Sequence, residues 1–495
     1  MTIKIIQNNR PPAVGDVDKQ RCWVVLTPEG AKASLLRKLP HGVVLERCLK
    51  RLPAAHRGKP QRIDLPNRNA TVLAHAAVAP GADPFKRLTA ARKLVAQLAA
   101  YRPAEVALTA HGFDDEQAEA VLEPVVAALL AAAAVLPDYR ADAEPHDSLK
   151  RIRILGHRFE HGFARTLAEA EGNALARYLT ALPPNELTPG EYRRRAEALA
   201  KEHGWTADFL DEKALKRRHA GAFLAVCRGS PQRDAGILHL TYKPRGGSRG
   251  GHGIALVGKG ICYDTGGVNV KSSKYMLGMQ GDMQGSAVAL GTLLALSRLG
   301  VDFQVDCWLA LAMNHIGARA YIPNEVVKAA DGTSIEVIHT DAEGRMVLAD
   351  TLHFASRAKP AMIMDYATLT GACVYALGKA YSGVFTNRDD WHGALIETGR
   401  RSGERVWPFP QDEDYDKALS SDIADTKQCA VDGEPDHILA ARFLRRFVKD
   451  GVPWVHMDLS AGECRGGLAH VPGDFTGFGI RYSCALLLDT RPQAG

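Results

Sequence analysis

The second half of the chain alternates between short apolar runs and helical patterns, and this alternation limits the possible folds most. Residues 253–258 are typical of a buried strand, residues 282–299 of a helix rich in small side chains, and residues 303–312, 335–338 and 361–366 of further strands. Strands that alternate with helices form a mostly parallel sheet covered by helices. Ligands bind at the carboxyl ends of the strands in such sheets. We therefore expect an α/β fold whose functional residues directly follow strand runs.

With 495 residues the chain is long for one domain, because a domain takes roughly 150 residues. Residues 1–150 mix strand-like runs with Ala- and Leu-rich helices at 84–101 and 115–136, and they carry no catalytic constellation. A polar segment with a proline at 138–148 marks a boundary. We predict a smaller N-terminal α/β domain over 1–150, a linker helix over 151–185 and a larger catalytic domain over 186–495. The catalytic domain is expected to hold a mostly parallel central sheet flanked by helices.

Charge and cysteine content exclude several classes of protein. The formal net charge of +6 is a small excess over 62 basic and 56 acidic residues, so nucleic-acid binding is possible but unsupported. The nine cysteines form no CxxC pair, which excludes a zinc finger or a disulfide scaffold and favours reduced thiols in a cytoplasm. The longest apolar run, at 125–136, is shorter than the roughly 20 residues of a membrane span. We expect a cytoplasmic protein without a membrane partner.

A first polar cluster follows the strand run at 253–258. Residues 257–267 read V-G-K-G-I-C-Y-D-T-G-G, which brings Lys259 and Asp264 together, and Lys271 and Asp282 follow. The glycines suggest a phosphate loop, but Gly260 stands where such a loop needs Ser or Thr. Taken alone, these charges are typical of surface ion pairs.

A second cluster, T-D-A-E-G-R at 340–345, follows the strand run at 335–338. In an extended backbone, two-residue spacing directs the carboxylates of Asp341 and Glu343 to the same side. Two carboxylates held together repel each other unless a cation lies between them. The alternative is an ordinary helix N-terminus, where acidic residues suit the helix dipole.

Together the two clusters supply four carboxylates, whose charge two divalent cations would neutralise. Two metal ions a few ångströms apart activate a bridging hydroxide for hydrolysis. The lysine at 259 is a possible amine ligand, whereas Lys271 and Arg345 remain as cations for an oxyanion or another anion. The sequence has no HExxH motif, so a zincin has no support.

Several motifs in the same order resemble the leucine aminopeptidase (cytosol aminopeptidase) family of two-metal exopeptidases. They are V-G-K-G-I-C-Y-D-T-G-G at 257–267, the lysine at 271, D-M at 282–283, T-D-A-E-G-R at 340–345 and A-T-L-T-G-A at 367–372. L-P-P-N at 182–185 and P-W-V-H-M-D at 453–458 extend the resemblance to about residues 175–481. The resemblance implies a metal-dependent aminopeptidase that removes N-terminal amino acids from peptides, with a leucine-like preference.

The resemblance also implies a role for each matching residue. Two divalent ions, zinc, manganese or magnesium, would be bound by Lys259, Asp264, Asp282, Asp341 and Glu343. Lys271 would polarise the scissile carbonyl, and Arg345 would hold a bicarbonate ion that shuttles a proton. The pocket for the N-terminal side chain would be lined by Met279, Thr368 and Gly371. The family further implies a homohexamer, in which the N-terminal domain contributes to assembly.

Three departures from the family pattern bear on specificity. His339 stands where the family usually has Asn, Gln280 replaces a basic residue, and residues 313–325 differ from the usual E-N-M-P segment. We expect His339 to be a structural residue near the metals rather than a sixth ligand. Two alternatives stay open: a DNA-binding regulatory member of the same family, and another two-metal hydrolase such as a phosphatase or nuclease.

Overall fold

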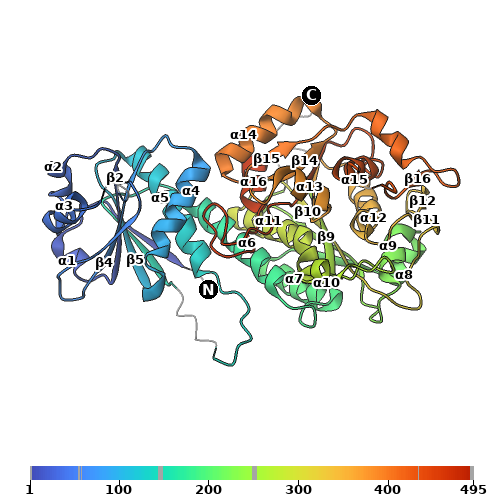
Figure 1. The fold of residues 1–495 in the computed structure, drawn as a ribbon, viewed down its shortest axis with the longest axis horizontal. Helices are drawn as coiled ribbons and strands as arrows, with labels where there is room; N and C mark the ends of the chain where they lie inside the picture. Colours follow the sequence, from blue (N-terminus) through green and yellow to red (C-terminus); the bar gives the residue numbers. More distant parts are fainter. Residues whose placement is uncertain are drawn as a thin grey trace. The chain divides into compact units, whose positions relative to one another are not determined.

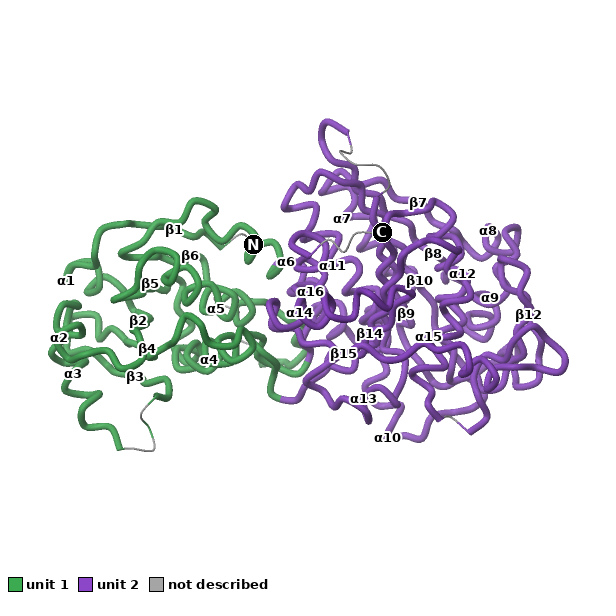
Figure 2. The backbone as a smooth tube through the Cα atoms, turned by 90° about the horizontal axis from the view of Figure 1, so that it is seen from above, with its two compact units in different colours: residues 1–170, 466–474 green, residues 171–465, 475–495 purple. Residues whose placement is uncertain are grey.

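A computed structural model describes residues 3–53, 56, 58–142, 149–247, 253–432 and 434–490. The chain divides into two compact units, residues 1–170 with 466–474 and residues 171–465 with 475–495 (Figure 2). Of the boundary predicted at 138–148, residues 143–148 lie outside the described residues. The segment predicted as a linker helix, 151–185, contains strand β6 (Arg151–Leu155) and helix α6 (Ala164–Ala181), and the division between the units falls within α6.

The first unit is built on a six-stranded sheet in the order β1-β6-β5-β2-β4-β3. Its strands are β1 (Lys4–Asn8), β2 (Cys22–Pro28), β3 (Gln61–Asp64), β4 (Val72–Val78), β5 (Glu105–Ala110) and β6, and only the β3–β4 pair is antiparallel. Alternate residues of β2 enter two separate cores. One core lies under α1 (Val14–Val17), α2 (Ala33–Leu36) and α3 (Gly42–Lys50), and the other under α4 (Pro84–Ala96) and α5 (Asp115–Ala133).

The second unit contains an eight-stranded sheet in the order β15-β14-β17-β13-β9-β10-β8-β7. Its four central strands, β17 (Trp454–Asp458), β13 (Met362–Ala367), β9 (Ile254–Asp264) and β10 (Val305–Asn314), are parallel. At the edges, β14 (Ser382–Thr386), β8 (Gly236–Tyr242) and β7 (Thr206–Asp211) each pair antiparallel with an inner neighbour, and β15 (Val406–Pro408) is parallel to β14. The α/β fold class is confirmed, with a parallel centre in a mixed sheet.

Helices cover both faces of this sheet (Figure 1). A Cβ on Gly258 of β9 would lie 2.3 Å from the Cα of Ser286 in α11 (Gln284–Leu299). The next residue, Lys259, approaches Gly344 of α12 (Glu343–Arg357), where an added Cβ would lie 2.7 Å from Nζ of Lys259. Because successive side chains of a strand point to opposite faces, α11 and α12 lie on opposite sides of β9. Helices α9 (Gly221–Cys227) and α15 (Asp436–Arg445) share the core on the α12 side.

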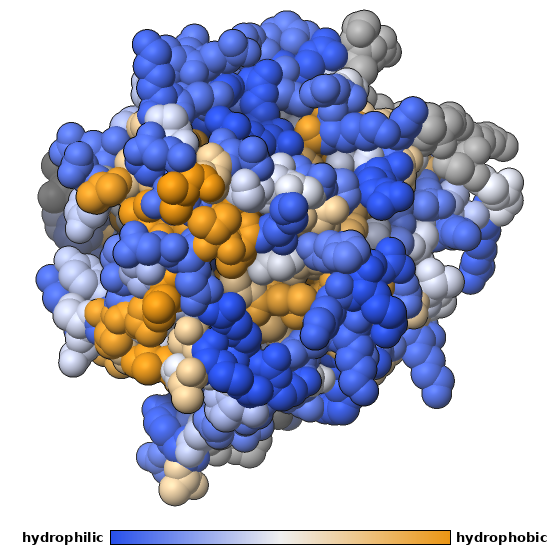
Figure 3. Space-filling model, turned by 90° about the vertical axis from the view of Figure 1, so that its right-hand side faces the viewer, coloured by the Kyte–Doolittle hydropathy of each residue, from blue (hydrophilic) through white to orange (hydrophobic). Residues whose placement is uncertain are grey.

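A small three-stranded sheet, β11 (Val326–Lys328), β12 (Ser334–Glu336) and β16 (Thr426–Lys427), leads into the segment before α12. The other helices are α7 (Pro189–His203), α8 (Glu212–Arg217), α10 (Ser273–Met276), α13 (Gly371–Leu377), α14 (His392–Ser402) and α16 (Ile480–Ala485), with the short helices η2 (Ala99–Tyr101), η3 (Met279–Met283), η4 (Asp389–Trp391), η5 (Glu413–Leu419) and η6 (Leu486–Thr490). In the described part of the chain, no helix is both long and apolar enough to cross a membrane. Figure 3 shows one face of the molecule, on which hydrophobic groups form separate patches among hydrophilic ones.

Candidate metal centre and active site

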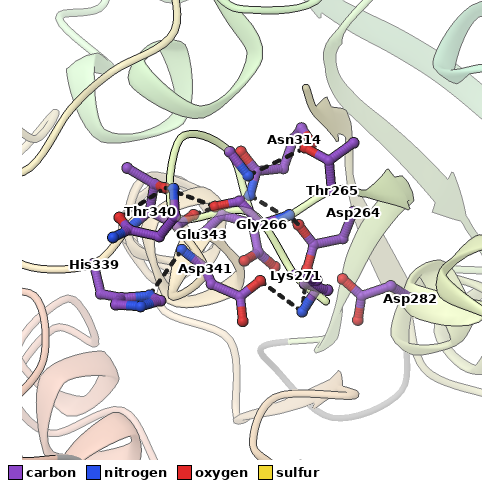
Figure 4. A network of polar contacts seen from close by, with 12 residues as sticks. Asp264, Thr265, Gly266, Lys271, Asp282, Asn314, His339, Thr340, Asp341 and Glu343 are labelled. Carbon is purple, nitrogen blue, oxygen red and sulfur yellow. Dashed lines mark hydrogen bonds and ion pairs between the residues drawn. The ribbon is translucent and has the colours of Figure 1, made fainter. Parts of the chain in front are cut away.

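The predicted metal ligands gather at the carboxyl ends of the central parallel strands. Lys259 and Asp264 belong to β9, and Asp264 is its last residue. Asp282 lies in η3, Asp341 lies in the turn before α12, and Glu343 is the first residue of α12. The backbone between Asp341 and Glu343 is not extended as the first interpretation assumed, because Ala342 has φ −103° and ψ 38°. Glu343 begins α12, as the helix alternative expected, and both carboxylates nevertheless face the first cluster (Figure 4).

Three of the acidic residues are close enough to share a cation. One carboxylate oxygen from each of Asp264, Asp341 and Glu343 lies within 4.8 Å of the other two. Asp264 and Glu343 are buried, and Asp341 is half-buried. Oxygen ligands gathered at this spacing suit a divalent metal ion.

Two lysines lie between the carboxylates. Nζ of Lys259 is 2.9 Å from Oδ1 of Asp282 and 2.9 Å from Oε1 of Glu343. Nζ of Lys271 is 2.8 Å from Oδ2 of Asp264 and 2.6 Å from Oδ1 of Asp341. Lys259, as a neutral amine ligand, and Lys271, as an ammonium, can therefore both contact the same group of carboxylates.

The acidic centre has more negative charge and more oxygen atoms than its lysines satisfy. Among the described residues, Oδ2 of Asp282 and Oε2 of Glu343 are buried without a hydrogen-bond partner. Burial and the neighbouring carboxylate of Asp264 raise the pKa of Glu343 to about 8. Burial is also the largest cause that raises the pKa of Asp282 and of Asp341. Bound cations would stabilise the charged form of these buried carboxylates and give their unpaired oxygens a partner. These residues therefore fit a metal centre.

The carboxylates around Lys271 favour its protonated form. Burial alone lowers the pKa of its ammonium, but the carboxylates of Asp264 and Asp341 outweigh burial, and the pKa is raised overall. Its side chain keeps 15% exposure, whereas that of Lys259 keeps 4%. A protonated lysine that reaches the open side of the centre can stabilise negative charge on a substrate oxygen.

Arg345 lies in the first turn of α12 with 2% exposure. Nη2 donates to Oδ1 of Asp436 at 2.7 Å, and Nη1 donates to the carbonyl oxygen of Gln428 at 3.2 Å. Asp436 thus forms an ion pair with the guanidinium where the family resemblance implies a bicarbonate, and Nε of Arg345 is buried without a hydrogen-bond partner among the described residues.

Of the predicted substrate residues, Thr368 contacts two of the predicted metal ligands. Its hydroxyl donates to Oδ1 of Asp282 at 2.7 Å, and its carbonyl oxygen accepts from Nζ of Lys259 at 3.0 Å. Met279 begins η3, three residues before Asp282, and Gly371 begins α13, three residues after Thr368. Met279 is half-buried and Gly371 is exposed, and the pocket role of both residues stays a prediction.

Sequence reasoning missed several residues that hold the ligands in place. Nδ2 of Asn314, at the end of β10, donates to Oδ1 of Asp264 at 2.8 Å and to the carbonyl oxygen of Thr340 at 2.9 Å. The fully buried Gln428 donates to the carbonyl oxygen of Ala342 at 2.9 Å. The position of Asn314 just after a predicted strand could have revealed it, whereas Gln428 carries no sequence signal.

A buried carboxylate also shapes the loop that carries Thr368. Asp458, the last residue of β17, accepts hydrogen bonds from the backbone of Leu369 at 3.0 Å and from the hydroxyl of Thr370 at 2.7 Å. His339 contributes differently, because its Nδ1 accepts from the backbone N–H of Asp341 at 3.3 Å. That contact supports the turn before α12 rather than adding to the carboxylate cluster.

Known proteins are similar to this chain over most of its length. Residues 174–484 match the cytosol aminopeptidase family, catalytic domain. A probable cytosol aminopeptidase of Synechococcus sp. (strain WH7803) is 37% identical over 349 residues, which cover 69% of this chain and 70% of that protein. A probable cytosol aminopeptidase of Prochlorococcus marinus is 37% identical over 352 residues, which cover 69% of each chain.

Two solved structures are also similar. The bottromycin maturation enzyme BotP in complex with Mn matches with a TM-score of 0.80 at 29% identity, over 94% of this chain and 99% of that one. A tomato leucine aminopeptidase mutant matches with a TM-score of 0.83 at 26% identity, over 99% and 97%. Neither the DNA-binding alternative nor another class of two-metal hydrolase gains support from these matches. The chain belongs to the cytosol aminopeptidase family and is a metal-dependent aminopeptidase.

Proposed function

We propose that the protein removes N-terminal residues, leucine-like ones preferred, from peptides with two divalent metal ions held by Lys259, Asp264, Asp282, Asp341 and Glu343. The observation that carries this proposal is the pair of buried oxygens, Oδ2 of Asp282 and Oε2 of Glu343, that lack a partner among the described residues. Bound metal ions would supply an activated water and a site for the free α-amine of the peptide.

Lys259 and Lys271 have different roles in the proposed reaction. Lys259 must give up its proton to serve as a ligand, and its contacts with Asp282, Glu343 and the Thr368 carbonyl fix the position of Nζ. Lys271 keeps its proton and presents it to the carbonyl oxygen of the scissile bond. Negative charge that develops on that oxygen is stabilised by an ammonium already in place.

We assign the pocket for the N-terminal side chain to Met279, Thr368 and Gly371. Thr368 supports this assignment because it touches Asp282 and Lys259, next to where the reacting carbonyl must lie. Met279 and Gly371 each lie three residues along the chain from one of these contacts, and they offer an apolar side chain and open space. An apolar pocket wall favours leucine-like side chains.

Zinc or manganese, with magnesium as a third candidate, suits four carboxylates and one amine. Manganese in the similar BotP structure supports this assignment. The bicarbonate implied at Arg345 does not fit the contacts there, because the carboxylate of Asp436 already neutralises the guanidinium. No step of the proposed reaction therefore uses that ion.

We further propose that the protein assembles as a homohexamer in the cytoplasm and that residues 1–150 take part in assembly. Exposed apolar side chains near the small three-stranded sheet support an assembly surface, since Ile322, Val326, Ile423 and Val431 are each about half exposed or more. The native mass can be measured by light scattering. A monomer at all concentrations would reject this assignment.

The activity is tested with a panel of aminoacyl amides after chelation and return of zinc, manganese or magnesium. Each amide is paired with its N-acetyl analogue, which lacks the free amine. We expect metal-dependent hydrolysis of the free-amine substrates only, fastest with leucine-like residues. If no free-amine substrate is hydrolysed with any metal, the proposed function is wrong.

A further inference from the structure

Arg345 is paired with a carboxylate of its own chain. Its guanidinium is almost fully buried, and Nη2 lies 2.7 Å from Oδ1 of Asp436. Asp436 is the first residue of α15, where the dipole of that ten-residue helix favours a negative charge.

This pair changes what the site can bind. Arginine has five N–H donors, and only two hydrogen bonds engage them here; Nε is buried without a partner among the described residues, so the donors alone leave room for another acceptor. Charge is the stronger limit, because a free anion on the same guanidinium would lie beside the Asp436 carboxylate. Like charges this close repel.

We propose that Asp436 supplies the anion at Arg345, so that the aminopeptidase works without bicarbonate. The expected effect of bicarbonate on the reaction rate rests on the proposed function. The expectation that the wild-type site binds no bicarbonate does not depend on turnover. Asp436 is therefore a positioning residue that acts through Arg345 and need not touch the substrate.

The chain offers a matched control pair in the same unit. Arg442, also on α15, donates to Asp416 at 2.8 and 2.6 Å. The exposures of this pair are 8% and 31%, close to the 2% and 26% of Arg345 and Asp436. Within the described part of the chain, neither Arg442 nor Asp416 forms a hydrogen bond or ion pair with a predicted metal ligand. Asp416→Ala thus removes a similar ion pair without altering the proposed anion position.

The test compares the wild type, Asp436→Ala and Asp416→Ala in buffer freed of carbon dioxide and in the same buffer with added bicarbonate. We expect bicarbonate to change the wild-type and Asp416→Ala rates by less than about twofold. Asp436→Ala should lose about tenfold or more without bicarbonate, because a buried guanidinium is left unpaired, and should recover with bicarbonate or formate. If Asp436→Ala does not fold, Asp436→Asn replaces it in the test, because asparagine keeps an oxygen acceptor but carries no charge.

Binding is measured separately by the line width of ¹³C-bicarbonate in NMR spectra of the metal-loaded proteins. We expect broadening that competes with formate in Asp436→Ala and none in the wild type. A wild type that binds bicarbonate and slows tenfold in its absence overturns the inference, as does an Asp436→Ala variant that no small anion restores. Absence of turnover in every protein would instead reject the proposed function, and the NMR result would still decide the anion site.

Discussion

Gln428 is expected to control how tightly the metal ions bind, although it contacts neither a metal ligand side chain nor the substrate. Its side-chain oxygen accepts from the backbone N–H groups of Ile338 and His339 at 3.2 Å each, and its amide donates to the carbonyl oxygen of Ala342 at 2.9 Å. These three bonds fix both sides of the turn that carries Asp341. Gln428 itself is fully buried.

Gln428→Leu removes these three bonds, together with a side-chain hydrogen bond to Tyr321, but leaves the backbone carbonyl that binds Arg345. At about 1 kcal/mol for each hydrogen bond, the free energy of unfolding should fall by about 3 kcal/mol. Residues that orient metal ligands typically change metal affinity by about 10–100-fold when mutated. We therefore expect zinc binding to weaken by about 10–100-fold, with much of the activity restored at high zinc concentration.

The assay is a zinc titration against a competing chromophoric chelator, with urea unfolding of the metal-free protein beside it. Gln304→Leu is the control, because it loses one hydrogen bond, 2.7 Å to Asp306, outside the metal centre. It should cost about 1 kcal/mol and leave zinc affinity unchanged. If Gln428→Leu loses stability but binds zinc as tightly as the wild type, Gln428 does not position the ligands and the reasoning is refuted.

Three further predictions address single residues. Lys271→Ala should lower kcat by about 100-fold or more while the metal content, measured by atomic emission, stays that of the wild type; retained turnover would reject the role of Lys271. Gly344→Ala would place a Cβ 2.7 Å from Nζ of Lys259 and should abolish most activity, whereas Gly393→Ala, with open space at its Cβ position, should leave kinetics unchanged. Burial raises the pKa of Asp350 to about 7. Between about pH 4 and 7 the unfolded chain therefore loses a proton that the folded protein retains, so the free energy of unfolding falls as pH rises. Other buried carboxylates with raised pKa values contribute in the same direction, so Asp350→Asn should reduce this fall in urea unfolding curves, and an unchanged pH dependence would contradict the assignment.

Local sequence predicted the candidate ligands and indicated the fold class, which the structure confirms. The strand run at 253–258 and the motif after it lie on one continuous element, β9, so their order alone predicted acidic residues at a strand end. Strand β6, in the segment predicted as a linker helix, alternates apolar and charged residues as R-I-R-I-L, and that period-two pattern was available to sequence reasoning.

Only the tertiary structure decided what surrounds these ligands. Asp436 accepts a hydrogen bond from Arg345 although the two residues are 91 positions apart in the sequence, and Gln428 donates one to Ala342 at a separation of 86 positions. The antiparallel edge strands β7 and β8, and the return of residues 466–474 to the first unit, likewise depend on long-range pairing. Hydrophobic periodicity and motif spacing describe only neighbours along the chain. The partner of a buried charge is set by which distant elements pack against it, and here that partner decides whether Arg345 needs an anion from solution.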